Sequence, residues 1–341
     1  MNQTPQVTIV VPCYNYAHYL PATLQSIAAQ DVDRWECIIV DDGSTDNTFD
    51  VGQEWAQRDA RFIYLRQNNA GLAAARNVGI RSARGKYIQF IDADDLIEPG
   101  KISRQIRLIE SLSENALVYS SFQYLDDSMA TFDPDPNSLV AKRTIIRSLI
   151  FDWERGFSIP IHTFLFKAVQ LANAGGFTEG LPTHEDIDLH IRLAINDVEF
   201  VHHAEKLALY RIHSSSMARN HTRMQAGYLM ALGNILTNVR SPRLRFQLFV
   251  RYGTEVARCL VDFIKGREIS VKRSVFQIGH PYLSLLSVLL LPIFLPTFFL
   301  AKTVQKTRSL FGIGRPFSDS CQDEHITPQS DSLDSGPQAT K

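Results

Sequence analysis

Three acidic residues follow a strand-like run in the segment Phe90-Ile91-Asp92-Ala93-Asp94-Asp95. Residues 87–91 are mostly aromatic or β-branched and apolar, which is typical of a buried strand. Alternate residues of an extended segment point to the same face, so we expect Asp92 and Asp94 to lie together. Mg²⁺ or Mn²⁺ would relieve the repulsion between two such carboxylates, because these ions prefer oxygen ligands. The motif therefore suggests a metal site for a diphosphate, and a solvated acidic turn is the alternative.

The elements that position this motif alternate along the first 91 residues. Short apolar runs that read as strands alternate with helix-like stretches, which predicts an α/β fold: a mostly parallel sheet with helices on both faces. The predicted strands are Val7–Val11, Trp35–Val40, Phe62–Leu65 and Lys86–Ile91, and the predicted helices are Leu20–Ala29, Thr48–Ala60 and Leu72–Ala83.

Polar clusters follow the other predicted strands as well. The carboxyl ends of parallel strands meet at one edge of a sheet, so these clusters should converge with the acidic triplet. Together they offer carboxylates for a base or ribose and an arginine for phosphate, which suits a nucleoside diphosphate. The P-loop and dinucleotide-binding fingerprints are absent from the sequence, so phosphate binding would depend on the metal and the arginine. The clusters are Pro12-Cys13-Tyr14-Asn15, the segment 41–46 (DDGSTD), and Asn69-Ala70-Gly71 with Arg76-Asn77.

These segments occur in the order found in the family 2 glycosyltransferases, which the chain resembles over roughly residues 6–217. Those are inverting enzymes of the GT-A fold, so the resemblance implies a GT-A domain. Each matching piece alone is weak, and their order makes the match specific. The pieces are VTIVVPCYN (7–15), IIVDDGSTD (38–46), NAGLAAARN (69–77), DADD (92–95), GGF (175–177) with HEDIDL (184–189), and YRIHS (210–214) to Met217.

The resemblance implies roles for individual residues. Asp186 would be the general base, with Glu185 as its neighbour. Asp94, helped by Asp92, would hold Mg²⁺ or Mn²⁺. Asp41 would contact the nucleotide base with Asp42 close by, Arg76 would lie near the diphosphate or Asp94, and His213 would complete the phosphate or metal site. The full set implied for nucleotide-sugar binding is Pro12, Tyr14, Asn15, Asp41, Asp42, Asn69, Gly71, Arg76, Asp92 and His213.

Several of these residues also have a purely structural interpretation. Acids at positions 185 and 186 open a predicted helix, where they interact favourably with the helix dipole. Arg76 could be a solvated arginine on an alanine-rich helix, and a lone histidine such as His213 is more often structural. The spacing of Asp188 and Arg192 predicts an i,i+4 ion pair. No role is assigned to the other histidines at 162, 202 and 203.

The second half of the chain predicts further helices and two strands. We divide the chain into a glycosyltransferase domain (1–217), a helical extension (218–273), an apolar membrane-associating segment (274–301) and a tail that is basic and then polar and disordered (302–341). The predicted helices are Lys101–Leu112, Arg143–Phe151, Glu185–Ile195, Arg223–Val239 and Pro242–Ile264, the strands are Ala116–Tyr124 and Glu199–Tyr210, and Asp126–Asn137 is predicted to be a flexible loop.

The segment 274–301 contains no charged residue, and Pro281–Ala301 has about the length that a membrane-spanning helix needs. Three interpretations are open: a spanning or broken re-entrant helix, which we favour, an amphipathic surface element, or a buried helix of a soluble core. Pro292 and Pro296 complicate a straight span. Because cations flank both ends, the positive-inside rule does not give an orientation.

Composition excludes several other classes of protein. The 341 residues include 35 Lys and Arg against 36 Asp and Glu, so nothing indicates a nucleic-acid partner, which needs a basic face. The four cysteines form no C-x-x-C pair, which argues against a disulfide framework or zinc site and favours a reducing compartment. The first residues lack the pattern of a secretory signal.

The sequence therefore predicts a membrane-associated, metal-dependent, inverting hexosyltransferase. It would move a sugar from a nucleotide-diphosphate sugar to a glycan or lipid-linked acceptor, with its catalytic domain in the cytoplasm at the membrane face. Two alternatives remain. One is a nucleotidyltransferase on a related fold, which usually carries a basic glycine-rich loop after the first strand. The other is a non-catalytic nucleotide or glycan binder, which need not retain Asp94 and Asp186.

Overall fold

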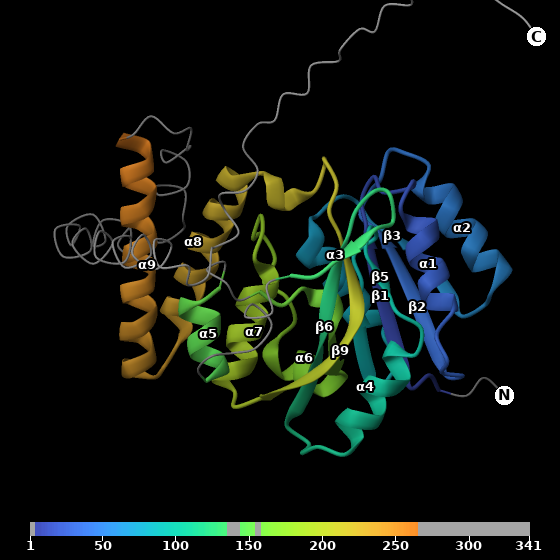
Figure 1. Ribbon diagram of the computed structural model, residues 1–341, viewed down its shortest axis with the longest axis horizontal. Helices are drawn as coiled ribbons and strands as arrows, with labels where there is room; N and C mark the ends of the chain where they lie inside the picture. The colour runs from blue at the N-terminus through green and yellow to red at the C-terminus, as the bar shows by residue number, and fades with distance from the viewer. Residues whose placement is uncertain (1–3, 135–143, 154–157, 265–341) are drawn as a thin grey trace, which may run out of the picture.

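A curled sheet of nine strands forms the centre of the molecule, and helices cover both of its faces (Figure 1). The computed structural model describes residues 4–134, 144–153 and 158–264. Along the main path of the sheet the strand order is β3-β2-β1-β4-β8-β6-β9-β5, and β7 pairs with β6 outside that path. Strands β1 to β4 therefore form one half of the sheet, and the later strands form the other half.

The first side consists of four parallel strands joined by helices, as the sequence predicts. Each strand is an apolar run, and each helix begins within a few residues of the turn that ends the strand before it. The strands are β1 (Val7–Cys13), β2 (Trp35–Asp41), β3 (Phe62–Arg66) and β4 (Tyr87–Phe90), and the helices are α1 (Leu20–Ala28), α2 (Thr48–Arg58) and α3 (Leu72–Ser82).

The pairing register brings the carboxyl ends of these strands to one edge. Cys13 at the end of β1 lies beside Asp41 at the end of β2, and Asp41 lies beside Arg66 at the end of β3. On the other side of β1, Val10 pairs with Phe90 at the end of β4. The convergence of the polar clusters that follow these strands is confirmed.

The second side of the sheet is mixed, so the prediction of a mostly parallel sheet is wrong there. β8 (Phe164–Lys167) runs antiparallel to both β4 and β6 (Ala116–Leu125). β9 (Glu199–Arg211) runs parallel to β6, and β5 (Leu96–Ile97) pairs antiparallel with β9. The short strands β5 and β8 were not predicted, because two to four apolar residues carry no readable period.

The remaining helices agree closely with the sequence, with one exception among the helices and one in a predicted loop. α6 was not predicted, and the described part of the supposed loop 126–137 folds into a hairpin in which β7 (Thr131–Phe132) pairs with β6. The predicted ion pair joins Asp188 Oδ2 to Arg192 Nη2 at 2.8 Å. The helices are α4 (Lys101–Glu110), α5 (Ile145–Phe151), α6 (Ala168–Ala174), α7 (Glu185–Ile195), α8 (His221–Asn238) and α9 (Pro242–Ile264).

Alternating side chains of the central strands build two hydrophobic cores, one on each face of the sheet. Val10 and Val40 pack with α3, α5 and α7 on one face, whereas Ile9 and Ile39 pack with α1 and α4 on the other. This alternation follows from the two-residue period of a strand. Side chains of α8 and α9 belong to the first core, so the helical extension packs directly against α7 and α5.

None of the helices in the described part of the chain is both long and apolar enough to cross a bilayer. The predicted membrane-associating segment 274–301 and the tail 302–341 lie outside the described residues. The prediction for these segments is therefore untested.

A glycine on α3 allows this helix to pack closely on β1. A Cβ added at Gly79 would lie 2.2 Å from Val10 Cγ1 in the core. We expect Gly79→Ala to lower the free energy of unfolding by about 1–3 kcal/mol through overpacking, measured by denaturant titration. Ser82→Ala, on an exposed position of the same helix, is the control and should change stability by less than about 0.5 kcal/mol. Equal stability of both variants would contradict the packing account.

Candidate active site

The end of β2 forms a rigid polar turn around Asp41. This side chain is fully buried, and its Oδ1 accepts a hydrogen bond from Ser44 N at 2.8 Å. Its Oδ2 accepts a hydrogen bond from Tyr64 Oη and lies 3.7 Å from Nε of the half-exposed Arg66. The two β3 residues extend the predicted site, because β3 is the next strand along the sheet edge.

The loop after β1 is joined to this turn by Asn15. Its Oδ1 accepts hydrogen bonds from Thr45 N at 2.7 Å and from Asp46 N at 3.3 Å. Its backbone takes a positive φ of 60°, which asparagine tolerates better than most residues. Of its predicted companions, Pro12 is buried within β1 and Tyr14 is 45% exposed. Asn15 therefore fixes the turn after β2 relative to β1.

Asp42 organises the loop that leads into α3. One carboxylate oxygen accepts hydrogen bonds from Ala70 N at 2.8 Å and Gln67 Nε2 at 2.7 Å, and the other accepts from Gly71 N at 2.8 Å. Gly71 has a φ of 92°, and a Cβ added there would meet only open space. Asp42 thus holds a loop whose Asn69 and Gly71 are exposed to solvent, in keeping with a ligand-facing surface.

Asp94 meets His213 at the predicted metal motif. Asp94 Oδ2 and His213 Nε2 are 2.9 Å apart, and the imidazole is packed 4.8 Å from the ring of Tyr19. The 2.9 Å separation is that of a hydrogen bond, and a carboxylate oxygen and an imidazole nitrogen are also groups that bind divalent ions. Arg211 Nε donates to the Asp94 carbonyl at 2.8 Å, which ties the end of β9 to the acidic loop.

The described residues contain no group of three or more acidic, histidine or cysteine side chains arranged to hold a metal ion by themselves. Mg²⁺ is commonly held by one or two carboxylates together with the phosphates of a substrate. The donor set formed by Asp94 and His213, with Asp92 two residues away, suits that second kind of site.

Arg76 lies beneath the site and links its two acidic motifs. Its side chain is 2% exposed, Nη2 lies 2.6 Å from Asp92 Oδ1, and Nη1 contacts Glu185 Oε1. The sequence predicted Arg76 near the diphosphate or Asp94. The structure places it against Asp92, two residues from Asp94, where its contacts are carboxylates and its surface is closed to solvent.

Burial and Arg76 act in opposite directions on the pKa values of the two acids that open α7. Burial raises the pKa of Glu185 and Asp186, and Arg76 opposes the rise at both carboxylates. Burial alone would lower the pKa of Arg76, but Asp92 and Glu185 outweigh it and raise that pKa. Asp186 remains partly exposed at the start of α7, so its carboxylate is the accessible member of the pair.

A second buried pair lies behind Asp94 and was missed from the sequence. Asp95 Oδ1 accepts from Arg211 N at 2.8 Å, and Asp95 Oδ2 lies 2.9 Å from His162 Nδ1. Burial, with Asp94 and Asp92 adding to it, raises the pKa of Asp95 well above its usual value. Burial lowers the pKa of His162 to about 3. Only the third acid of the motif hinted at this pair, because no spacing in the sequence relates His162 to it.

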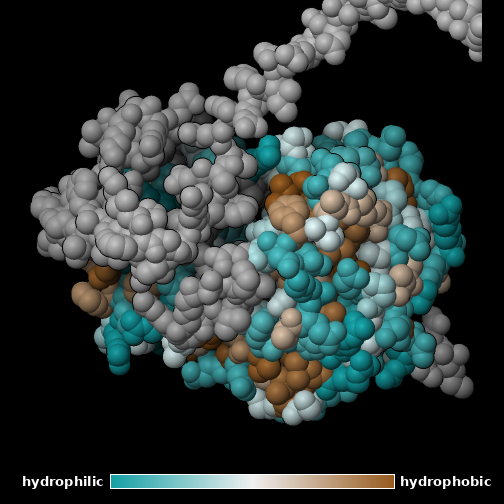
Figure 2. Space-filling view, viewed as in Figure 1, coloured by the Kyte–Doolittle hydropathy of each residue, from teal (hydrophilic) through white to brown (hydrophobic). Residues whose placement is uncertain are grey.

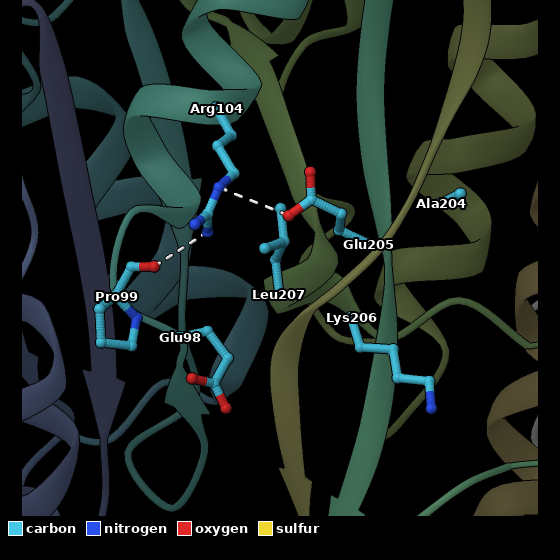
Figure 3. Close-up of a pocket in the computed structure, with 7 residues that line it drawn as sticks. All are labelled: Glu98, Pro99, Arg104, Ala204, Glu205, Lys206 and Leu207. Carbon is cyan, nitrogen blue, oxygen red and sulfur yellow. Dashed lines mark hydrogen bonds and ion pairs between the residues drawn. The ribbon is translucent and has the colours of Figure 1, made fainter.

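A separate pocket of about 630 Å³ lies beside residues 204–207 in the middle of β9, next to the loop that follows β5 (Figure 3). Arg104 lies within it, 3.4 Å from Glu205, and donates to the Pro99 carbonyl at 3.0 Å. None of the predicted site residues is among its lining residues.

Replacing Arg76 should show the free-energy cost of burying Glu185 and Asp92 without a cationic partner. We expect Arg76→Met to lower the free energy of unfolding by about 3–5 kcal/mol, because Glu185 and Asp92 would lose their cationic partner. The loss should shrink as pH falls, since protonated carboxyl groups are less costly to bury. Denaturant titration at several pH values measures this, with the exposed Arg81→Met on the same helix as control. A loss that does not depend on pH would contradict the electrostatic account.

Known proteins resemble the chain over part of the residues that build this site. Residues 8–168 match the model of the family described as Glycosyl transferase family 2. A putative glycosyltransferase of Bacillus subtilis, EpsH, is 36% identical over 159 residues, 46% of this chain and 46% of the relative. An uncharacterized glycosyltransferase of Rickettsia typhi is 30% identical over 218 residues, 62% of this chain and 65% of the relative. The match therefore spans less than two thirds of either relative.

Solved structures share the fold at low sequence identity. TarS 1–349 of S. aureus, in complex with UDP-GlcNAc, has a TM-score of 0.61 and 16% identity, and the match covers 79% of this chain and 78% of that one. The mannosyltransferase PcManGT of Pyrobaculum calidifontis, in complex with GDP-Man and Mn²⁺, has a TM-score of 0.53 and 16% identity over 84% and 87%. The expected α/β GT-A-like fold is confirmed, with the mixed sheet described above. Residues 8–168, a little under half of the chain, match the model of glycosyl transferase family 2, and the relatives that resemble the chain are glycosyltransferases.

Proposed function

We propose that the chain transfers a sugar from a nucleotide-diphosphate sugar to a hydroxyl group of a glycan or lipid-linked acceptor, with inversion at the anomeric carbon. The observation that carries this proposal is the chain of contacts from Asp94 and His213 to Asp186. Asp92 and Arg76 join the candidate metal pair to Glu185, the neighbour of the candidate base. The loop of the candidate metal pair and the start of α7 are thereby linked through one arginine.

The donor would bind at the carboxyl edge of the parallel strands. The turn around Asp41 and the loop held by Asp42 offer polar groups for the base and ribose, and Asn69 and Gly71 leave open space next to them. The complexes of TarS with UDP-GlcNAc and of PcManGT with GDP-Man support a nucleotide-sugar donor. A bound Mg²⁺ or Mn²⁺, held by Asp94 and His213 with help from Asp92, would offset the negative charge that develops on the diphosphate.

Asp186 would act on the acceptor. A sugar hydroxyl is a weak nucleophile, and a carboxylate within hydrogen-bond reach that takes its proton typically contributes about 10²–10⁴-fold in rate. The raised pKa of Asp186 makes it a better proton acceptor than a solvated aspartate. Attack opposite the leaving diphosphate inverts the anomeric carbon, and it needs one base and no covalent intermediate.

The hairpin 126–132 would form one wall of the acceptor site. Asp127 Oδ1 accepts from Tyr19 Oη at 3.1 Å, and Met129 Sδ accepts from Nη1 of Arg211 at 3.5 Å, the arginine that holds Asp94. Met129 and Phe132 at this hairpin remain 55% and 43% exposed. Figure 2 shows patches of apolar surface among the hydrophilic residues of the visible face. Such side chains suit the apolar face of a sugar ring.

The charge-free segment 274–301 leads us to propose that the enzyme works at the cytoplasmic face of a membrane. A lipid-linked acceptor would then lie in the same membrane. This placement rests on sequence, and the donor chemistry above does not depend on it.

Donor turnover by the purified protein in detergent tests the proposed function. We expect hydrolysis of one nucleotide sugar from a panel with Mn²⁺ or Mg²⁺, and loss of that turnover in EDTA and in Asp94→Ala. Asp186→Asn should still bind the donor, measured by calorimetry, but should lower transfer to an acceptor by about 10²-fold or more. Asp50→Ala, an exposed acid on α2, is the control. A folded protein that binds no nucleotide sugar with metal present would refute the proposal.

Truncation of the hairpin side chains should affect the acceptor alone. We expect Met129→Ala and Phe132→Ala to raise the acceptor KM by about 10-fold, the effect of losing one buried apolar contact, and to leave donor hydrolysis unchanged. Steady-state kinetics at saturating donor measure this, with the exposed Phe246→Ala on α9 as control. An unchanged acceptor KM, or an equal effect on the donor KM, would exclude the hairpin from the acceptor site.

A further inference from the structure

Residues 182–184, which precede Glu185 and Asp186, are in contact with α8. The Pro182 carbonyl accepts a hydrogen bond from Arg223 Nε at 3.3 Å. Thr183 is 2% exposed, and its Oγ1 donates toward the carbonyls of Arg223 and Met224 at 3.3 and 3.5 Å. The segment 182–184 therefore lies along one turn of α8, directly ahead of the candidate base.

Gly227 allows this close approach. A Cβ added at that position would lie 2.0 Å from Thr183 Oγ1, 2.8 Å from Thr183 O and 2.9 Å from Thr183 N. Two of these three atoms belong to the backbone, so a change of rotamer would not relieve the overlap. The next residue on the helix, Tyr228, places its ring 5.2 Å from the ring of His184. One face of α8 thus contacts two consecutive residues of the loop.

His184 occupies a backbone conformation that needs such support. Its φ of 63° is in the left-handed region, which is costly for a residue with a side chain and persists where the surroundings determine it. It is the residue before α7, and its carbonyl accepts the helical hydrogen bond from Asp188 N at 3.1 Å. The direction in which α7 starts, and with it the direction of Asp186, depends on this one residue.

The hydroxyl of Thr183 connects the two sets of contacts. Thr183 Oγ1 lies 2.9 Å from His184 Nδ1, and a hydroxyl has only one proton to donate. The contact to His184 Nδ1 is the shortest of the three, and it forms a hydrogen bond whichever of the two groups supplies the proton. The orientation of the His184 ring is then fixed by α8 through Thr183.

We propose that Thr183 and His184 are positioning residues, through which α8 holds the Asp186 carboxylate where it can accept the proton of the acceptor hydroxyl. This inference rests on the proposed function. It gives the helical extension a role in the reaction: a displacement of α8 moves the base, whereas the donor turn around Asp41 belongs to the other side of the sheet.

A matched pair of substitutions at position 183 tests the hydroxyl. Thr183→Val keeps the shape of the side chain and removes the hydroxyl, whereas Thr183→Ser keeps the hydroxyl. We expect Thr183→Val to lower kcat for transfer by about 10- to 100-fold, the scale of a small misplacement of a reacting group. The donor KM and the donor Kd should stay unchanged, and Thr183→Ser should restore most of the rate.

A second pair separates positioning from stability. Gly227→Ala should lower kcat in the same way, whereas Ala231→Val overpacks the same helix one turn further along and should lower Tm without a comparable loss of kcat. Equal losses of kcat in these two variants at equal Tm, or wild-type kcat in Thr183→Val, would overturn the proposal.

One measurement is independent of turnover. Nitrogen-15 NMR of histidine-labelled protein should show one predominant tautomer of His184 in the wild type and in Thr183→Ser, and a changed proportion of tautomers in Thr183→Val. If the wild type transfers no sugar but shows this pattern, the proposed function fails and the contact stands. If it transfers sugar and the His184 signal and kcat are the same in Thr183→Val, the positioning role fails alone.

Discussion

The buried guanidinium of Arg76 is the interaction on which the arrangement of the site depends. It contacts Asp92 from the loop after β4 and Glu185 from the start of α7, two segments that lie far apart in the sequence. Asp92 is two residues from Asp94, the proposed metal ligand, and Glu185 is next to Asp186, the proposed base. A buried cation between two acids needs both partners, because an uncompensated charge in this interior is costly. The distance between the metal motif and the base therefore follows from one side chain.

The donor side depends on backbone hydrogen bonds rather than on ion pairs. Asp42 accepts hydrogen bonds from two backbone N–H groups of the loop before α3, and Asn15 accepts two from the turn after β2. Since the parallel strands end side by side, a single short side chain spans the gap between neighbouring turns. The groups left open to solvent, Asn69 and the surroundings of Gly71, are those that a ligand could reach.

The helical extension packs against the sheet and α7 as part of the same hydrophobic core. Side chains of α8 and α9 share a core with α7 and the sheet, and α8 also contacts the loop that precedes Asp186. The next helix, α9, precedes the segment 274–301 in the sequence, for which the sequence predicts membrane association. The candidate base is supported by α8 and the proposed donor turn by β1 and β2, and side chains of all three elements belong to one core.

The sequence by itself determined the parallel half of the fold, since the strands and helices up to residue 91 have the clear periods of buried strands and amphipathic helices. It also determined which clusters meet, because parallel strands end at a common edge, and its ordered motifs named Asp94, His213 and Asp186 as candidates. Only the tertiary structure decided the antiparallel strand β8, the bridging role of Arg76 and the contacts of His162 and Thr183. These features depend on residues that are distant in the chain, and a short apolar run or a lone histidine carries no period or spacing that names its partner. The packing of the second half of the chain brings them together, so they could not be read before the fold was known.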